Sequence, residues 1–256
     1  MISNPSSPSI AAKYARWTLS FGLLFGLLLG NSRSCDAHAP DLFMEVLKCV
    51  PTSKIEHTVE TKDAVDTARV DTDLSGPDYY SVAVGGLGRP AGSQKAHLLW
   101  YKITNPIPAP AKQITCIDVV RGEESDKLEI GSAEFFLNPA QRLANGPPSK
   151  VPHGLDLYKA HRVIGEAARK VQIDIAGESK SAKRVFGKPL FVCIPTDEWH
   201  HDEYTPATHR KNAFVVYEVD EQPVDSRFTL IDQFGLNQVT AKKSCWICVA
   251  ATVSID

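Results

Sequence analysis

The sequence lacks any strong excess of charge. Its 28 Lys and Arg residues against 30 Asp and Glu residues give a formal net charge of −2 over 256 residues. It also has no block of basic residues interleaved with aromatic ones. Proteins that bind nucleic acid or anionic membranes through charge carry such basic surfaces. The composition therefore argues against nucleic acid as a partner, and it leaves the N-terminal segment as the one expected route to a membrane.

The apolar run near the N-terminus falls short of the roughly 20 residues that a membrane-spanning helix needs. It covers residues 17–30 (WTLSFGLLFGLLLG), has 14 residues and follows Lys13 and Arg16. Positive charge before an apolar core of this length is typical of a signal peptide. We therefore expect residues 1–35 to be a signal peptide and the protein to be exported, so that it is periplasmic, at the cell surface or extracellular. An uncleaved N-terminal membrane anchor is the alternative.

Cysteine is sparse, with six residues in the chain, and Cys35 lies in the segment expected to be removed. In an oxidising compartment some of the other five are expected to form disulfides. The sequence does not determine which cysteines pair. Because five is odd, one would be free, bonded to another chain, or joined to Cys35. The candidate disulfide cysteines are Cys49, Cys116, Cys193, Cys245 and Cys248.

The most informative feature is an internal repeat. An apolar strand, a second strand ending in an Asp- and Gly-containing turn, and a closing strand occur three times. Tyr101, His161 and Tyr217 occupy matching positions, at spacings of 161−101=60 and 217−161=56 residues. A repeat of this kind determines the architecture, because each copy is one supersecondary unit that packs against its neighbours.

Within each unit we predict four strands, rich in β-branched and aromatic residues that alternate with polar ones, as in residues 171–175. Asp118, Asp174 and Asp232 recur at the end of the second strand, with a glycine shortly after each, as a tight turn requires. Helix signals are scarce. The prediction is an all-β protein of three tandem repeats, each with about four antiparallel strands, that form small β-sandwich or barrel-like units.

The expected organisation places the first, second and third units at residues 97–140, 154–196 and 212–252. Residues 40–96 contain an N-terminal strand and a polar insertion, predicted to be a loop from residue 53 to residue 78. The end of that strand, residues 48–52 (KCVPT), is similar to residues 192–196 (VCIPT), so we interpret it as a fourth copy of the closing strand. The linkers, residues 141–153 and 196–211, are polar and contain proline, and exposed loops of this kind often carry binding residues.

Two motifs resemble a known family. The third unit contains the turn Asp232-Gln233-Phe234-Gly235, and the second closes with Cys193-Ile194-Pro195. In these motifs the chain resembles a family of exported bacterial β-repeat proteins catalogued as domain of unknown function 7450. The resemblance covers residues 97–250, although the first unit has Leu137 where the others have cysteine. It implies a β-repeat fold and transfers no catalytic residue.

Two further patterns are typical of binding sites. Cys245 and Cys248 form a C-x-x-C motif, which in redox enzymes opens a helix. Here it lies in a predicted strand, where residues three apart point to opposite faces, so we interpret both cysteines as structural. The chain has no second such pair for a zinc site. The run from Asp71 to Gly76 begins like a calcium loop, but Val82 replaces the required glutamate, which favours an Asx-rich turn.

The densest group of candidate metal ligands lies in the second linker. Histidines four apart on one helix face would be a strong metal signal, whereas adjacent histidines diverge. We interpret the group as a solvated loop, with divalent-metal binding as the alternative. The candidate ligands are His200, His201, Asp202, Glu203 and His209.

No residue is predicted to be catalytic or to bind a cofactor, since the G-x-S-x-G motif of many hydrolases is absent from the sequence. The sequence therefore predicts a non-enzymatic structural or ligand-binding module of the cell envelope or surface. Its partner would be an unknown envelope or extracellular ligand. The alternative is a secreted hydrolase or metal-dependent enzyme that uses the loop from His200 to His209.

Overall fold

The computed structural model describes residues 43–87, 96–143, 155–165, 170–177 and 181–255, without the side chains of 123–125 and 181. All of them belong to one compact unit, residues 38–256. The expected signal peptide, Cys35 and most of the first linker lie outside the described residues. Within those residues the chain forms strands and no helix, which confirms the all-β prediction. Accordingly, no helix in the described part is long and apolar enough to cross a membrane.

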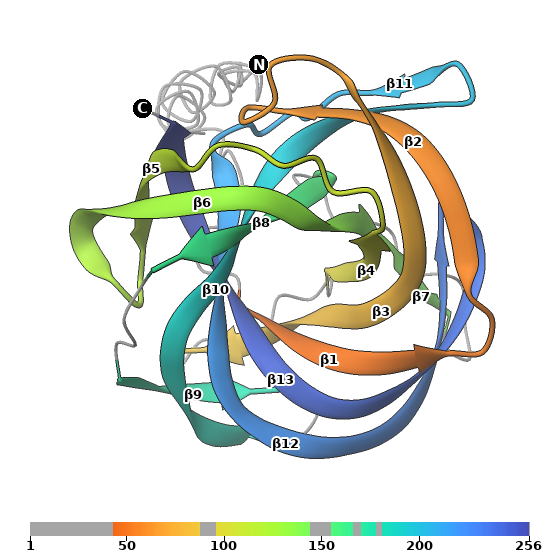
Figure 1. Cartoon of the computed structure of the whole chain (residues 1–256). Coiled ribbons are helices and arrows are strands. Elements are labelled where there is room, and N and C mark those ends of the chain that lie inside the picture. The colour runs from red at the N-terminus through yellow and green to blue at the C-terminus, as the bar shows by residue number, and fades with distance from the viewer. Residues whose placement is uncertain (1–42, 88–95, 144–154, 166–169, 178–180, 256) are drawn as a thin grey trace, which may run out of the picture. The chain divides into compact units, whose positions relative to one another are not determined.

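The described strands follow one another along the chain and form one sheet with antiparallel pairing (Figure 1). They are β1 (Phe43–Pro51), β2 (Ile55–Asp63), β3 (Val70–Gly86), β4 (His97–Ile103), β5 (Lys112–Asp118), β6 (Gly122–Pro139), β7 (Gln141–Leu143), β8 (Tyr158–Ile164), β9 (Val171–Ala176), β10 (Ser181–His200), β11 (Glu203–Thr205), β12 (Asn212–Asp232) and β13 (Gly235–Ile255).

Eight strand segments close into a ring. In order around the ring they come from β1, β3, β4, β6, β8, β10, β12 and β13, and β13 pairs again with β1. Figure 1 shows β1, β13 and β12 side by side in this arrangement. Because each segment pairs on both sides, the ring itself leaves no open strand edge. We call this the central ring; its segments are residues 43–48, 79–84, 97–102, 133–139, 158–162, 191–195, 212–218 and 246–250.

The inside of the central ring is filled by side chains. Alternate residues of a strand point to the same face, and the inward residues form one buried apolar cluster. Phe135 of β6 and Trp246 of β13, on opposite sides of the ring, have ring centroids only 6.4 Å apart. The indole N–H of Trp100 donates to the Ser81 hydroxyl at 3.0 Å. An eight-stranded ring is just wide enough for side chains to fill it, so this interior is a core.

Between its two ring segments, each unit leaves the ring as a hairpin that covers the outer face. The long strands bend at β-bulges, for example between Ile130 and Ala133 in β6. A bulge adds an unpaired residue and bends the strand without ending it. This is why the predicted third and fourth strands of each unit are continuous, as residues 127–131 and 134–137 are in β6. A second buried cluster fills the space between ring and hairpins.

The units do not form separate small sandwiches, which corrects the predicted arrangement. The outer strand of each hairpin pairs with a strand two units away, which is the end of a closing strand in three cases and the short strand β7 after β6 in the fourth. These pairs are β2 with β10, β5 with β13, β9 with β3, and β12 with β7. A lone two-stranded hairpin is marginally stable and leaves a strand edge exposed. Pairing between units gives each hairpin a further strand partner and covers that edge.

Residues 43–86 follow the same path as the three predicted units and form a fourth copy, which we call the N-terminal copy. Its opening strand is β1, its hairpin joins β2 to β3, and the end of β3 closes it. The stretch from Ser53 to Asp78, predicted to be a loop, is therefore largely strand, and Asp71 to Gly76 lies in β3 rather than in an Asx-rich turn. The polar composition reflects a hairpin with one exposed face, as the alternating burial of β2 shows.

Candidate functional site

Three repeated aspartates close the turns of the outer hairpins. Asp63, Asp118 and Asp232 are the last residues of β2, β5 and β12. Oδ1 of Asp118 accepts the backbone N–H groups of Val120 (2.8 Å) and Arg121 (2.9 Å). Oδ1 of Asp63 and of Asp232 accept turn N–H groups in the same way. The turn-forming role predicted for Asp118 and Asp232 is therefore confirmed.

The second oxygen of each carboxylate reaches a different unit. Tyr217 donates its hydroxyl to Oδ2 of Asp118, and Tyr101 to Oδ2 of Asp232, both at 2.7 Å. Nε2 of His161 lies 2.6 Å from Oδ2 of Asp63. The three residues that match in the repeat thus share one structural role. We call each pair a carboxylate contact, and each joins a hairpin to the ring strand of the unit two positions away.

The fourth hairpin, formed by β9 and β10, lacks a carboxylate contact because both residues of the pair are replaced. Leu47 of β1 holds the position of the tyrosines. Continuing the β9–β3 register by one residue places Gly177, and not the predicted Asp174, at the aspartate position. Asp174 is exposed in the middle of β9. Glu45 occupies the space instead, since a Cβ on Gly177 would lie 2.5 Å from its carboxylate, and Glu45 faces the buried Arg184 at 3.5 Å.

A buried arginine adjoins one of these contacts. Arg121, which is buried, donates to Tyr217 at 3.1 Å and pairs with Asp126 at 2.8 Å. Burial and the charge of Asp118 raise the pKa of Tyr217 far above its ordinary value, so its hydroxyl stays a donor. Burial acts in the same way on Tyr101, with a contribution from Asp232. These polar groups therefore connect the units structurally.

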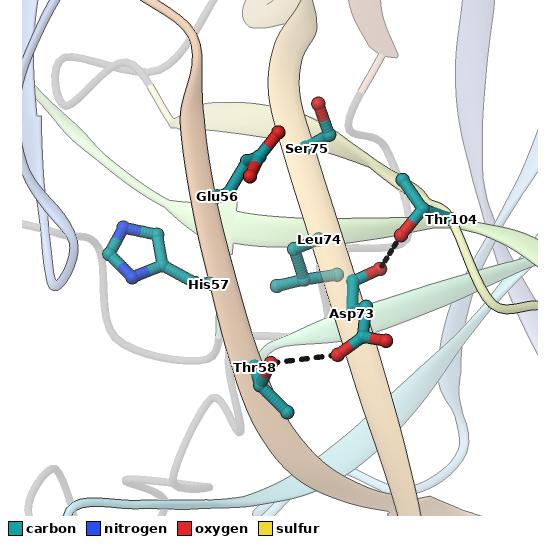
Figure 2. A pocket seen from close by; sticks show the side chains of 7 residues that line it. All are labelled: Glu56, His57, Thr58, Asp73, Leu74, Ser75 and Thr104. Atoms are coloured by element: carbon teal, nitrogen blue, oxygen red, sulfur yellow. Dashed lines mark hydrogen bonds between the residues drawn. The ribbon is translucent and has the colours of Figure 1, made fainter.

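An open groove of 440 Å³ follows the β2–β3 hairpin. Thr58 donates its hydroxyl to Asp73 Oδ1 at 2.7 Å, and the Thr104 hydroxyl donates to the Asp73 carbonyl at 3.3 Å. Figure 2 shows both bonds, with the His57 ring directed away from Asp73. The lining contains two carboxylates and three hydroxyls but no Lys or Arg; it comprises Glu56, His57, Thr58, Asp73, Leu74, Ser75 and Thr104. Such a surface suits ligands that donate hydrogen bonds.

His57, which lines the groove, also contacts the repeat motif of the third unit. Its ring stacks on Phe234 of the Asp-Gln-Phe-Gly turn, with centroids 4.3 Å apart, and His200 meets Phe234 edge-on at 5.5 Å. Burial lowers the pKa of both histidines, and the nearby His201 lowers it further. We therefore expect His57 and His200 to be neutral at neutral pH, which suits rings packed against an aromatic residue.

Two buried acids lie beside this turn. Glu198 is 1% exposed, and the Gln233 amide donates to it at 2.7 Å. Burial raises the pKa of Glu198 to about 7, with a further contribution from Asp232. Burial also raises the pKa of Asp232 to about 6, although Tyr101, the Phe234 backbone N–H and Asn138 donate to its carboxylate.

The second linker, predicted to be exposed, is partly strand. Thr196 to His200 form the end of β10, and β11 pairs back onto it. Thr196, Asp197 and Glu198 are buried because β2 pairs with this segment. The outer face carries a stack of three side chains. The guanidinium carbon of Arg69 lies 3.9 Å from the centroid of the Trp199 ring, and the ring centroids of Trp199 and Tyr204 are 4.8 Å apart.

The candidate metal ligands occupy different parts of this hairpin and of the loop that follows. His201 and Asp202 form its tip with positive φ angles of 48° and 65°. His209 lies elsewhere, 2.8 Å from the Thr208 hydroxyl and 3.6 Å from Asp156. Among the described residues, no group of three or more His, Cys, Asp or Glu side chains is arranged to hold a metal ion. The structure therefore does not gather the five candidates into one ligand set.

The five described cysteines are free and buried, so the expected disulfides are not present. Cys193 and Cys248 point into the central ring from β10 and β13, with β12 between these strands. The thiol of Cys245 faces the Val46 carbonyl at 3.5 Å, and that of Cys49 faces the Leu47 carbonyl at 3.3 Å. Each thiol thus has its own position within a strand.

Asp63 and Glu198 are the most prominent residues that the sequence analysis missed. Asp63 lies 118−63=55 residues before Asp118, which is close to the repeat spacing. This spacing indicates a further copy of the repeat, but the polar composition of the surrounding residues favours a loop and makes the copy hard to recognise. Glu198 has no local signal, because its burial depends on β2, which lies more than 100 residues earlier in the chain.

The comparison with protein families gives one match. A family model described as a repeat of unknown function, DUF7450, matches residues 97–250. No curated protein and no solved structure matches the chain. The match spans the first, second and third units, whereas the N-terminal copy lies before it.

Proposed function

We propose that this chain, which belongs to the DUF7450 repeat family, is an exported, non-enzymatic module that binds a ligand at the cell envelope or surface. The observation that supports the proposal is that the repeated aspartates are engaged in hydrogen bonds within the fold. Asp63, Asp118 and Asp232 each bond a turn with one oxygen and another unit with the second. Acids committed in this way stabilise a rigid scaffold, so ligand binding falls to the exposed outer faces of the hairpins.

The groove on the β2–β3 hairpin is the surface that we assign to the ligand. Its 440 Å³ lies within the range of about 300–1,000 Å³ common for ligand sites. The carboxylates of Glu56 and Asp73 disfavour anions and accept hydrogen bonds from hydroxyl and ammonium groups. The ligand class that fits is hydroxyl-rich and neutral or cationic, such as an amine-bearing glycan. The signal peptide expected at residues 1–35 is consistent with an extracellular source for such a ligand.

The test is calorimetric titration with three soluble oligosaccharides of equal length. We expect chitosan oligomers, which carry amines, to bind more tightly than their N-acetylated counterparts, and sulfated oligomers not to bind. Asp73→Asn should weaken chitosan binding by about tenfold, the effect of losing one charge-assisted bond. Asp225→Asn is the matched control, because Asp225 is an exposed aspartate outside the groove. Equal effects of the two substitutions, or no binding of any oligomer, would contradict the proposal.

A secreted hydrolase is the rival function, and one observation favours it. Glu198 and Asp232 are neighbouring acids whose pKa values are raised to about 7 and about 6. Shifted acids of this kind are common in acid–base catalysis. The low exposure of Glu198 argues against direct contact with a substrate. Release of reducing ends from the same oligosaccharides, abolished in Glu198→Gln, would support the rival.

A further inference from the structure

One of the three carboxylate contacts uses a histidine where the other two use tyrosine. The hydroxyls of Tyr101 and Tyr217 remain donors because burial and their aspartates raise their pKa values. A histidine differs because the number of its N–H donors changes with protonation near neutral pH. The contact between the N-terminal copy and the second unit, through Asp63 and His161, is thus chemically distinct.

Both ring nitrogens of His161 face acceptors. The side chain is buried; Nε2 lies 2.6 Å from Asp63 Oδ2, and Nδ1 lies 3.0 Å from the Gly131 carbonyl oxygen. The carbonyl can only accept. Burial would raise the pKa of Asp63, but the hydrogen bond and charge of His161, assisted by Lys159, outweigh it and hold that pKa below its ordinary value. Two N–H donors are therefore required, and only the imidazolium form supplies them.

Other charged groups lie near the Asp63–His161 pair. On β8, Lys159 bonds Asp66 of the turn after β2 at 2.7 Å. Asp71 of β3 lines the same small cavity of 50 Å³ beside Lys159 and His161. From β6 the neighbouring group is the Gly131 carbonyl, which does not titrate. Asp63 is thus the hydrogen-bonded counter-ion of His161, whereas Lys159 has Asp66.

We propose that the Asp63–His161 contact is a pH-sensitive connection that holds the β2–β3 hairpin to the ring strand β8 while His161 carries both protons. When His161 loses one proton, one of its ring nitrogens becomes an acceptor. That nitrogen then faces another acceptor, either the Gly131 carbonyl or the Asp63 carboxylate, inside a buried site. The stabilising contribution is therefore present while His161 carries both protons and is lost when it gives up one of them. This connection is independent of any ligand in the groove, although the groove lies on the same hairpin.

Amide hydrogen exchange tests the proposal on the whole chain. After correction for intrinsic rates, protection of β2 relative to β5, whose contact uses Tyr217, should fall by about tenfold between about pH 6 and about pH 9. His161→Tyr, which introduces the residue of the other contacts, should remove this change. The matched control His201→Asn replaces an exposed histidine at a positive-φ position and should retain it. A ratio of β2 protection to β5 protection that stays constant across this pH range in the wild-type protein would overturn the proposal.

A second measurement needs no substitution. Two-bond ¹H–¹⁵N correlation spectra of the wild-type protein report the protonation of each ring nitrogen. We expect the His161 signals at about pH 6 to show both nitrogens protonated. A neutral tautomer at that pH would overturn the proposal, whatever the behaviour of the variants.

Discussion

At the scale of single residues, the aspartates at the hairpin ends determine how the units meet. Each carboxylate has two hydrogen-bonding directions, one within its own turn and one toward another unit. The same residue type thus has a local function that a sequence pattern reveals and a long-range function that it does not. Asp174 shows the difference, because it follows the pattern but is exposed.

Asp118→Ala should therefore be strongly destabilising. It removes the turn acceptor and leaves the buried Arg121 without one of its carboxylate partners. Breaking a buried pair from one side costs about 3–5 kcal/mol, and we expect a loss of that order in the free energy of unfolding. Asp174→Ala is the control and should change stability by less than about 0.5 kcal/mol. Urea denaturation measures both, and equal losses would contradict the assignment.

Glu198 gives a prediction for the pH dependence of stability. Its pKa of about 7 in the folded state exceeds that of an exposed glutamate, so folding favours its protonated form. Its contribution is present at acid pH and is lost as pH rises toward about 7. Glu198→Gln should therefore be more stable than wild type above about pH 7 and should lack this slope. Thermal denaturation across pH, with Glu203→Gln at the exposed hairpin as control, provides the comparison.

At the scale of elements, the long bent strands explain the main differences from the predicted secondary structure. Bulges such as that between Phe186 and Pro189 in β10 allow one strand to belong first to a hairpin and then to the ring. Local sequence shows an interruption at such points, which resembles a break between two strands. The same strands carry the cysteines, and their packing determines thiol chemistry.

The thiols should be unreactive in the folded protein. Burial raises the pKa of Cys49, Cys116 and Cys245 to about 12, so little thiolate forms near neutral pH. We expect alkylation of these cysteines, followed by peptide mass spectrometry, to be slow in native conditions and complete in denaturant without reductant. Labelling that requires reductant would instead show disulfides, as the sequence analysis predicted.

At the scale of the described body, the four copies depend on one another. The central ring needs β1 and β3 from the N-terminal copy, and each hairpin pairs with a unit two positions away. Separate tandem domains would fold and unfold independently, whereas copies that share one ring are expected to unfold together.

Truncation tests this interdependence. A fragment of residues 96–255 retains all that the family model matches but opens the ring at β4 and β13. We expect it to lack a cooperative thermal transition by circular dichroism, because two exposed ring edges and the loss of β2 as a partner of β10 remove much of its stabilisation. Residues 38–256 should unfold in a single transition. A fragment that folds as stably as the longer chain would contradict the shared-ring arrangement.

The sequence by itself determined the all-β class, most strand positions in the three units, the matched positions of Tyr101, His161 and Tyr217, and the turns at Asp118 and Asp232. These depend on local alternation and turn chemistry, which act between neighbouring residues. Only the tertiary structure decided the ring closure, the N-terminal copy and the partners of the carboxylates. Tyr101 and Asp232 are 131 residues apart in the chain, and His161 and Asp63 are 98 apart. Contacts at such separations arise from strand pairing around the closed ring, which no local pattern specifies.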